Sequence, residues 1–252
     1  MLSKSCEICV IDTQLMETVQ QTAGDSRIEE VTLAGGGASE PPLRATWQET
    51  WQAATKRGFD IAAALAGLVL LSPLLVVAAL AIWSDSPGPI LFRQRRVGRG
   101  FRPFFIFKFR TMVHEANPGS RTLTVAKDPR ITGVGRILRT AKIDELPQLV
   151  NVLMGDMSLV GPRPEVPHYV DLFRQDYEQI LTVRPGITDL ASIRYWNESA
   201  ILERAEDPEE EYLTYVLPDK IAMTREYLRR RSFFFDLVLI GRTVVKLFRR
   251  GS

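Results

Sequence analysis

An apolar segment in the first third of the chain restricts the fold most. Residues Ile61–Trp83 read IAAALAGLVLLSPLLVVAALAIW and contain no charged side chain. As a helix, about 20 such residues are long enough to cross the roughly 30 Å hydrocarbon core of a bilayer. The segment begins near residue 60, which is too deep in the chain for a cleaved signal peptide. The sequence therefore predicts an integral membrane protein whose anchor stays in the mature chain.

A proline divides this segment near its midpoint. Pro73 has no backbone N–H and bends or breaks a helix, and the Ser72 hydroxyl is placed to pair with a carbonyl that the proline leaves free. Basic residues flank both ends, so the positive-inside rule pulls each end toward the cytoplasm. They are Lys56 and Arg57 before the segment, and Arg93, Arg95, Arg96 and Arg99 after it. A kinked single crossing and a re-entrant hairpin both remain open, and the rarity of re-entrant elements favours the crossing.

The rest of the chain has room for one domain and a tail. It has 252 residues and a net charge of +2, so the whole protein is not expected to bind a polyanion. Residues 1–46, which include the linker AGGGASEPP, are expected to form a disordered N-terminal tail, and residues 47–252 a membrane-associated domain. Cys6 and Cys9 have CxxC spacing but no second Cys or His pair nearby, so neither a disulfide framework nor a metal site is expected there.

The periodicities after the apolar segment predict a mostly helical α+β body. Two short strands, Ile90–Gln94 and Phe104–Phe109, are separated by a Gly- and Arg-rich loop and form a small β-hairpin. The following patterns are helical. The expected helices cover residues 133–139, 144–154 and 165–181 and an amphipathic C-terminal segment that suits the membrane interface.

The adjacent carboxylates of Asp144 and Glu145 allow two interpretations. Asp144 is a good N-cap and Glu145 suits the first turn of a helix, so the pair needs no function. However, basic residues surround it, and carboxylates among cations at a helix start can bind Mg²⁺ and phosphate and can act as nucleophiles. Those basic residues are Arg136, Arg139 and Lys142 nearby, and Lys108, Arg110 and Arg163 on other segments. The second interpretation predicts phosphoryl transfer near a membrane.

A series of motifs resembles the bacterial sugar transferases, the monotopic phosphoglycosyl transferases that begin glycan assembly on polyprenyl phosphate. The resemblance runs from about Thr55 to Phe248 and depends on the order and spacing of the motifs. These are KRxxD (56–60), the Ser-Pro break, FxQxRxG (92–98), KFRTM (108–112), DPRIT (128–132), LRxxxIDELPQL (138–149), GDMSLVGPRP (155–164) and RPGIT (184–188).

The resemblance implies roles for the matched residues. Ser72 and Pro73 would mark the turn of a re-entrant membrane helix over about residues 59–83, which reverses the preference for a crossing. Asp144 would attack the β-phosphate of a nucleoside-diphosphate sugar, Glu145 would assist through Mg²⁺ or proton handling, and Arg139 would orient Asp144. Both carboxylates would be Mg²⁺ ligands. The substrate-binding residues would be Lys108, Arg110, Arg136, Arg163, Pro162 and Pro164.

The implied partners are a UDP-sugar donor, polyprenyl (undecaprenyl) phosphate and membrane lipid, at the cytoplasmic face of the bacterial inner membrane. Neither the sugar nor the oligomeric state is predicted. Many family members read RPGITG, whereas this chain reads RPGITDLASIRYWNE (184–198), so the sugar contacts of this region do not carry over. One alternative is a membrane-anchored glycosyltransferase that releases UDP. Another is a tethered nucleic-acid-binding regulator, which the near-zero net charge opposes.

Overall fold

The computed structural model describes residues 47–113 and 123–249, and their side chains from residue 53 onward. The described residues belong to one compact unit. The expected tail, residues 1–46 with Cys6 and Cys9, lies outside the described residues.

The apolar segment forms two helices that meet at an angle. Helix α2 (Trp47–Leu70) is followed by α3 (Ser72–Asp85), with Pro73 in the first turn of α3. The Ser72 hydroxyl donates to the carbonyl of Val69 at 2.8 Å. In an unbroken helix the N–H of residue 73 would bond to this same carbonyl, so the predicted compensation for the proline is confirmed.

The bend decides how these helices relate to a bilayer. Within the described residues no single helix is both long and apolar enough to span one. Ala53–Leu70 and Ser72–Asp85 meet that criterion as a pair, bent by 61° at the break.

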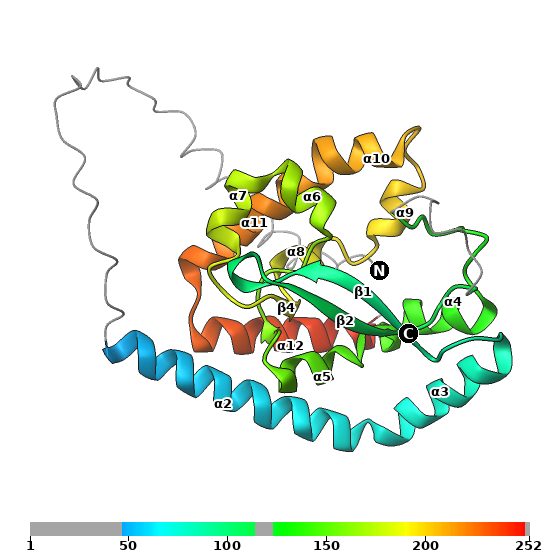
Figure 1. Ribbon diagram of the computed structural model, residues 1–252, viewed down its shortest axis with the longest axis horizontal. Coiled ribbons are helices and arrows are strands. Elements are labelled where there is room, and N and C mark those ends of the chain that lie inside the picture. The colour runs from blue at the N-terminus through cyan, green and yellow to red at the C-terminus, as the bar shows by residue number, and fades with distance from the viewer. Residues whose placement is uncertain (1–46, 114–122, 250–252) are drawn as a thin grey trace, which may run out of the picture. The chain divides into compact units, whose positions relative to one another are not determined.

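Both ends of the bent pair are attached to the rest of the body. Near the start of α2, Lys56 forms an ion pair with Asp236, and Arg57 Nη2 donates to the carbonyl of Leu153 at 3.2 Å. At the end of α3, Arg110 Nη2 donates to the carbonyl of Ile82 at 3.2 Å. The two ends of the apolar segment therefore lie against the same folded unit (Figure 1).

The predicted hairpin is confirmed. Strands β1 (Leu91–Val97) and β2 (Pro103–Phe109) pair antiparallel, so β1 extends three residues beyond the expected strand. A 3-10 turn, η1 (Arg99–Phe101), connects them, with Gly100 at a φ of 64°. Because Arg96 pairs with Phe104 and Phe92 with Lys108, the basic residues of both strands are held in register.

The segment around Asp144 differs from the prediction. Helix α4 (Gly133–Thr140) forms as expected, but the single predicted helix 144–154 is replaced by a 3-10 turn, η2 (Ile143–Glu145), and a shorter helix, α5 (Gln148–Met154). Pro147 precedes α5, and no side chain caps either element. The predicted N-cap role of Asp144 is therefore wrong. Gly155 ends α5 at a φ of 94°, as predicted.

A second pair of strands was not predicted. β3 (Ser158–Val160) and β4 (Gly186–Thr188) pair in parallel. Gly161 and Gly186 allow their backbones to approach closely, because a Cβ at Gly186 would lie 2.1 Å from the backbone nitrogen of Gly161. This pairing brings the loop after β3 beside the segment after β4.

The remaining helices surround the hairpin. The predicted helix 165–181 is broken at Phe173 into two short helices. In Figure 1, helices α6, α7, α10 and α11 lie on one side of the hairpin, and α2, α5 and α12 on the other. The bounds are α6 (Pro167–Leu172), α7 (Arg174–Ile180), α8 (Leu190–Arg194), α9 (Glu198–Leu202), α10 (Pro208–Glu211), a π-helical turn η3 (Tyr212–Val216), α11 (Leu217–Arg230) and α12 (Phe233–Arg249).

Candidate active site

A cavity of about 710 Å³ collects most of the predicted site residues. Its walls come from β2, α4, η2, the Pro-Arg-Pro turn after β3, α8 and α12. Its volume is in the range of sites for small-molecule substrates. The predicted residues that line it are Lys108, Arg136, Arg139, Asp144, Glu145, Arg163 and Pro164.

Asp144 presents a carboxylate that makes no capping bond. The residue is buried, with 7% of its surface exposed, and its Oδ1 has no hydrogen-bond partner among the described residues. Burial and the neighbouring charge of Glu145 raise the pKa of Asp144, against the opposing charges of Lys108, Lys142 and Arg139. The carboxylate is thus held among cations, and its Oδ1 is buried without a partner among the described residues.

Glu145, the adjacent residue, is fully paired. Arg163 donates to both of its oxygens, with Nη1 3.1 Å from Oε2, and Lys108 Nζ lies 3.1 Å from Oε1. Burial acts to raise the pKa of Glu145, but the charges of Arg163 and Lys108 together hold it well below the usual range. Glu145 is therefore an ionised anchor for two basic side chains.

Further basic groups face the cavity with little solvation. Burial lowers the pKa of Lys108, Arg139 and Lys142, and Arg139 Nη1 has no hydrogen-bond partner among the described residues. Lys142, which the sequence indicated only as a neighbouring charge, lies two residues before Asp144 and has a φ of 57°. Desolvated cations of this kind bind phosphate strongly, because few waters must be displaced.

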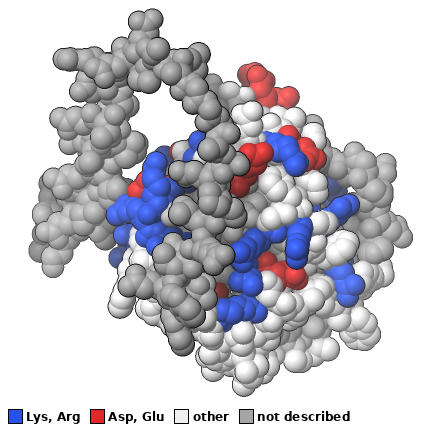
Figure 2. All heavy atoms as spheres, turned by 60° about the vertical axis from the view of Figure 1, so that its left-hand side comes forward, with Lys and Arg blue, Asp and Glu red and all other residues white. Residues whose placement is uncertain are grey.

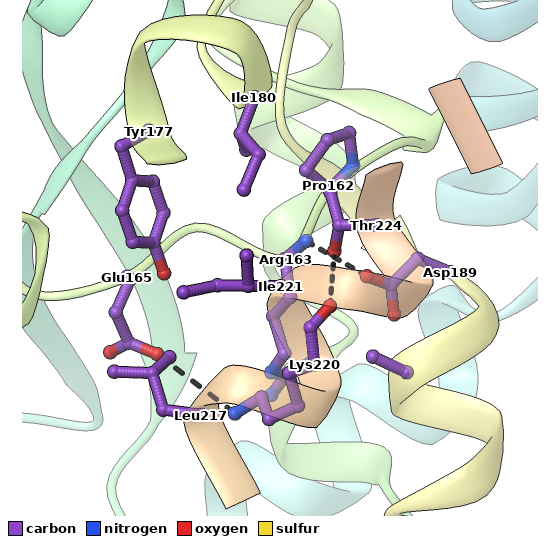
Figure 3. Close-up of a pocket in the computed structure, with 11 residues that line it drawn as sticks. Pro162, Arg163, Glu165, Tyr177, Ile180, Asp189, Leu217, Lys220, Ile221 and Thr224 are labelled. Carbon is purple, nitrogen blue, oxygen red and sulfur yellow. Dashed lines mark hydrogen bonds and ion pairs between the residues drawn. The ribbon is translucent and has the colours of Figure 1, made fainter. Parts of the chain in front are cut away.

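The Pro-Arg-Pro turn is fixed from behind. The backbone N–H of Arg163 donates to Asp189 Oδ2 at 3.2 Å, while Asp189 Oδ1 accepts from the N–H of Ser192 at 2.6 Å. Figure 3 shows Asp189 beside Arg163 in this arrangement. Pro164 lines the large cavity, whereas Pro162 lines a separate void of about 20 Å³ behind the turn. Asp189 therefore couples the turn to α8.

Arg110 does not lie with these residues. Its guanidinium donates to the carbonyls of Pro89 at 2.8 Å, Ser86 at 2.5 Å and Ile82 at 3.2 Å, and to Ser86 Oγ at 3.0 Å. The last carbonyls of a helix have no partners within it, and here Arg110 binds that of Ile82 in the last turn of α3 and two more in the turn that follows. The geometry gives Arg110 a structural role in place of the expected substrate contact.

Only one of the two carboxylates expected to bind Mg²⁺, that of Asp144, has an oxygen without a protein partner among the described residues. The part of the chain that the structure describes has no group of three or more Asp, Glu, His or Cys side chains that could hold a metal ion. Mg²⁺ in phosphoryl-transfer sites needs only one or two carboxylates besides substrate phosphates. Asp144 has a free oxygen for this purpose, whereas both oxygens of Glu145 are occupied by Arg163 and Lys108.

Three residues in or next to α8 were not predicted from the sequence. Asp189, Ser192 and Trp196 all lie in the segment where the chain departs from the RPGITG pattern of its resemblance, and Ser192 and Trp196 line the cavity. That departure was the only signal in the sequence, and it did not indicate which side chains face the site.

Comparisons with known proteins place this geometry in a family. A sequence profile described as bacterial sugar transferase matches residues 51–250. A UDP-glucose:undecaprenyl-phosphate glucose-1-phosphate transferase of Escherichia coli (strain K12) is 38% identical over 227 residues, which are 88% of this chain and 46% of that protein. A protein of the same description from Caulobacter vibrioides is 43% identical over 196 residues, 76% of this chain and 69% of that protein.

A third relative has a different sugar in its name. The UDP-N-acetylgalactosamine-undecaprenyl-phosphate N-acetylgalactosaminephosphotransferase of Aeromonas hydrophila is 38% identical over 192 residues, 75% of this chain and 42% of that protein. The chain thus spans less than half the length of the Escherichia coli and Aeromonas hydrophila relatives. The profile match covers most of the chain, and the ordered motifs around Asp144 and Arg163 lie inside it. The chain therefore belongs to the bacterial sugar transferase family.

Proposed function

We propose that this protein transfers a phosphosugar from a UDP-sugar to a polyprenyl phosphate such as undecaprenyl phosphate, giving a polyprenyl-diphosphate-sugar and UMP. This would be the first membrane step of glycan assembly. One observation carries the proposal: a buried carboxylate with a free oxygen, Asp144, lies among desolvated cations in a cavity large enough for a nucleotide sugar. Family membership and the activities in the names of the relatives support it.

In the first step, a carboxylate oxygen of Asp144 attacks the β-phosphorus of the donor. The bond between that phosphorus and the oxygen bridging to the α-phosphate breaks, and its electron pair leaves with UMP. The phosphosugar remains bound to Asp144 as an acyl phosphate. Lys108, Arg139 and Lys142 surround the reacting groups and stabilise the charge that builds up on the phosphoryl oxygens.

In the second step, a phosphate oxygen of polyprenyl phosphate attacks the same phosphorus. The acyl phosphate bond breaks, its electron pair returns to Asp144, and the carboxylate is regenerated. Two steps through one nucleophile allow a soluble donor and a lipid acceptor to use the same site in turn. Glu145 touches neither substrate in this scheme, because its oxygens hold Lys108 and Arg163 in place.

We also propose that Mg²⁺ takes part, with Asp144 as its protein ligand and donor phosphates as the others. When bound, the ion would neutralise part of the charge of the diphosphate. The free oxygen of Asp144 supports this arrangement, and the pairing of Glu145 argues against a second protein carboxylate.

We propose that α2 and α3 form a re-entrant hairpin in the cytoplasmic leaflet of the bacterial inner membrane. Both ends of the pair are tied to one folded body through Lys56 and Arg110, so both ends belong on one side of a bilayer. Large apolar side chains remain exposed on the pair, including Leu70 at 79% and Trp83 at 70%. In Figure 2 the lower edge of the visible face carries neither blue nor red side chains, and basic side chains lie above it.

Product analysis tests the proposed function. The protein would be incubated in nanodiscs with undecaprenyl phosphate, Mg²⁺ and a panel of UDP-sugars. We expect release of UMP with at least one donor, and a loss of more than about 1,000-fold in Asp144→Asn because the nucleophile is removed. Asp171→Asn is the matched control, since Asp171 is exposed on α6. Release of UDP, or near-normal turnover by Asp144→Asn, would contradict the proposal.

A further inference from the structure

Two residues that line the cavity have unpaired polar side-chain atoms. Ser192 on α8 and Trp196 just after it are four residues apart and both line the cavity. Trp196 is 91% buried, since only 9% of its surface is exposed. Its Nε1 and the Oγ of Ser192 are buried and have no hydrogen-bond partner among the described residues.

These atoms belong to a larger pattern. Burying a donor or acceptor without a partner costs free energy, so proteins keep such groups where something else pairs with them. Of the six unpaired buried side-chain atoms in the described part of the chain, four lie on residues that line this cavity. They are Asp144 Oδ1, Arg139 Nη1, Ser192 Oγ and Trp196 Nε1. Ser192 and Trp196 therefore resemble Asp144 and Arg139 in having a buried polar atom without a partner.

The position of the indole is fixed relative to the catalytic residues. The Nζ atoms of Lys142 and Lys246 lie 5.4 Å and 5.8 Å from the centre of the Trp196 ring, within the range of cation–π contact. Lys142 precedes Asp144 by two residues. Asp189 joins α8 to the Pro-Arg-Pro turn: it accepts from the backbone N–H of Arg163 (Figure 3) and from that of Ser192. Trp196 thus contacts Lys142, one of the cations whose charge acts on Asp144.

We propose that Ser192 and Trp196 form the subsite for the sugar ring of the nucleotide-sugar donor. The inference rests on the proposed function, in which the sugar stays next to Asp144 through both steps. A hexose offers hydroxyl oxygens that accept from Trp196 Nε1 and pair with the Ser192 hydroxyl. The phosphates are matched instead by the basic side chains, and a polyprenyl chain has no polar group that would satisfy an indole N–H.

Uracil is the competing occupant, because its two carbonyl oxygens could also accept from these donors. The position of Trp196 favours the sugar: in the transfer, the sugar side of the donor remains bound to Asp144, while the uridine side departs with UMP. An experiment can separate the two, since UMP carries the uracil but not the sugar.

Binding of UDP-sugars and UMP to variants tests the subsite. Trp196→Phe keeps an aromatic ring but removes the Nε1 donor, and Ser192→Ala removes the hydroxyl. Using calorimetry in nanodiscs, we expect each variant to bind the tightest UDP-sugar about 3- to 10-fold more weakly, the effect of one lost hydrogen bond. Affinity for UMP should change less than about twofold. Trp83→Phe, on the exposed face of α3, is the matched control and should leave the ratio of the two affinities unchanged.

Each outcome is decisive. Equal weakening of UMP and UDP-sugar would assign the donors to uracil and overturn the proposal. Unchanged affinity for both ligands in both variants would show that the side chains are structural, and would also overturn it. If Trp196→Phe fails to fold, Ser192→Ala gives the same comparison. A failure of the proposed function looks different: the wild-type protein would bind UDP-sugars but release no UMP.

Discussion

The guanidinium of Arg163 donates to both carboxylate oxygens of Glu145, with Nη1 and Oε2 3.1 Å apart. This bidentate pair separates the roles of two carboxylates that are adjacent in the chain. Glu145 is held ionised and occupied, whereas burial raises the pKa of Asp144 and leaves its Oδ1 unpaired. Neighbouring carboxyl groups whose environments push their pKa values apart are typical of sites that assign them different tasks.

The Arg163–Glu145 pair should be sensitive to a change that keeps the charge. Arg163→Lys replaces a planar two-point donor with a single ammonium, so Glu145 loses part of its pairing. We expect UMP release to fall about 10-fold or more, and the free energy of unfolding to fall by about 1–3 kcal/mol. The control is Arg174→Lys, because Arg174 is 60% exposed on α7. Normal activity in Arg163→Lys would mean that the bidentate geometry is dispensable.

The pH range over which UMP is released should be narrower than it would be if the aspartate and lysines of the site had the pKa values of exposed side chains. Because the pKa of Asp144 is raised, the protonated, non-nucleophilic form should persist to higher pH than for an exposed aspartate. Because the pKa values of Lys108 and Lys142 are lowered, positive charge should be lost at lower pH than for exposed lysines. Activity should therefore rise through the raised pKa of Asp144 and fall through the lowered pKa of the lysines.

Lys142→Arg tests the alkaline limb of this profile. Arginine keeps its charge at every pH used, so the fall in activity should move to higher pH. Rates measured from pH 4 to 10 would show it. An unchanged alkaline limb in this variant would exclude Lys142 as the titrating group.

Arg110 and Arg136 should respond in opposite ways to replacement by methionine. Arg110→Met removes a buried guanidinium that bonds to the carbonyls of Ile82, Ser86 and Pro89, so we expect a total loss of about 1–3 kcal/mol of stability. Arg136 is exposed and lines the cavity, so Arg136→Met should raise the KM for the donor with little change in stability. Thermal unfolding and donor titration of both variants check this. The assignments fail if Arg110→Met changes only the KM.

Gly186→Ala should destabilise the strand pair that positions the Pro-Arg-Pro turn of the site. The new Cβ would lie 2.1 Å from the backbone nitrogen of Gly161, which immediately precedes the Pro-Arg-Pro turn. Because the clash is with backbone atoms, it cannot be relieved by a side-chain rotation. We expect the free energy of unfolding to fall by about 1–3 kcal/mol, together with loss of activity. Gly58→Ala in α2 is the matched control, because nothing lies within 4 Å of its Cβ, and it should stabilise the helix by about 0.5–1 kcal/mol. Equal stability of the two variants would contradict the close approach of the strands.

Thiol labelling tests the membrane placement of α2 and α3. Single cysteines at Ala54 and Asp85, in a chain with Cys6→Ser and Cys9→Ser, would report the two exposed ends of the pair. We expect an impermeant reagent to label both in inside-out vesicles and neither in intact cells. Labelling of one position from each side would establish a crossing and refute the hairpin.

Interactions within a few residues of each other were predictable from the sequence. The break at Pro73, with Ser72 pairing to Val69, depends on a missing N–H and a hydroxyl three residues from its acceptor. The hairpin, helix α4 and the end of α5 at Gly155 likewise follow from local periodicity and backbone preference. Motif order alone was enough to identify the resemblance to the sugar transferases, and the comparisons confirm the family.

Other features were decided by contacts between distant parts of the chain. Arg110 and Arg163 look alike in the sequence, yet one holds a helix end and the other pairs with Glu145. Asp144 matched an N-cap pattern, but Pro147 and the surrounding cations place it in a 3-10 turn with a free oxygen. The parallel β3–β4 pair and the unpaired Trp196 also depend on segments far apart in the chain. A residue's chemistry is set by which groups surround it once desolvated, and only packing of the whole domain determines that environment.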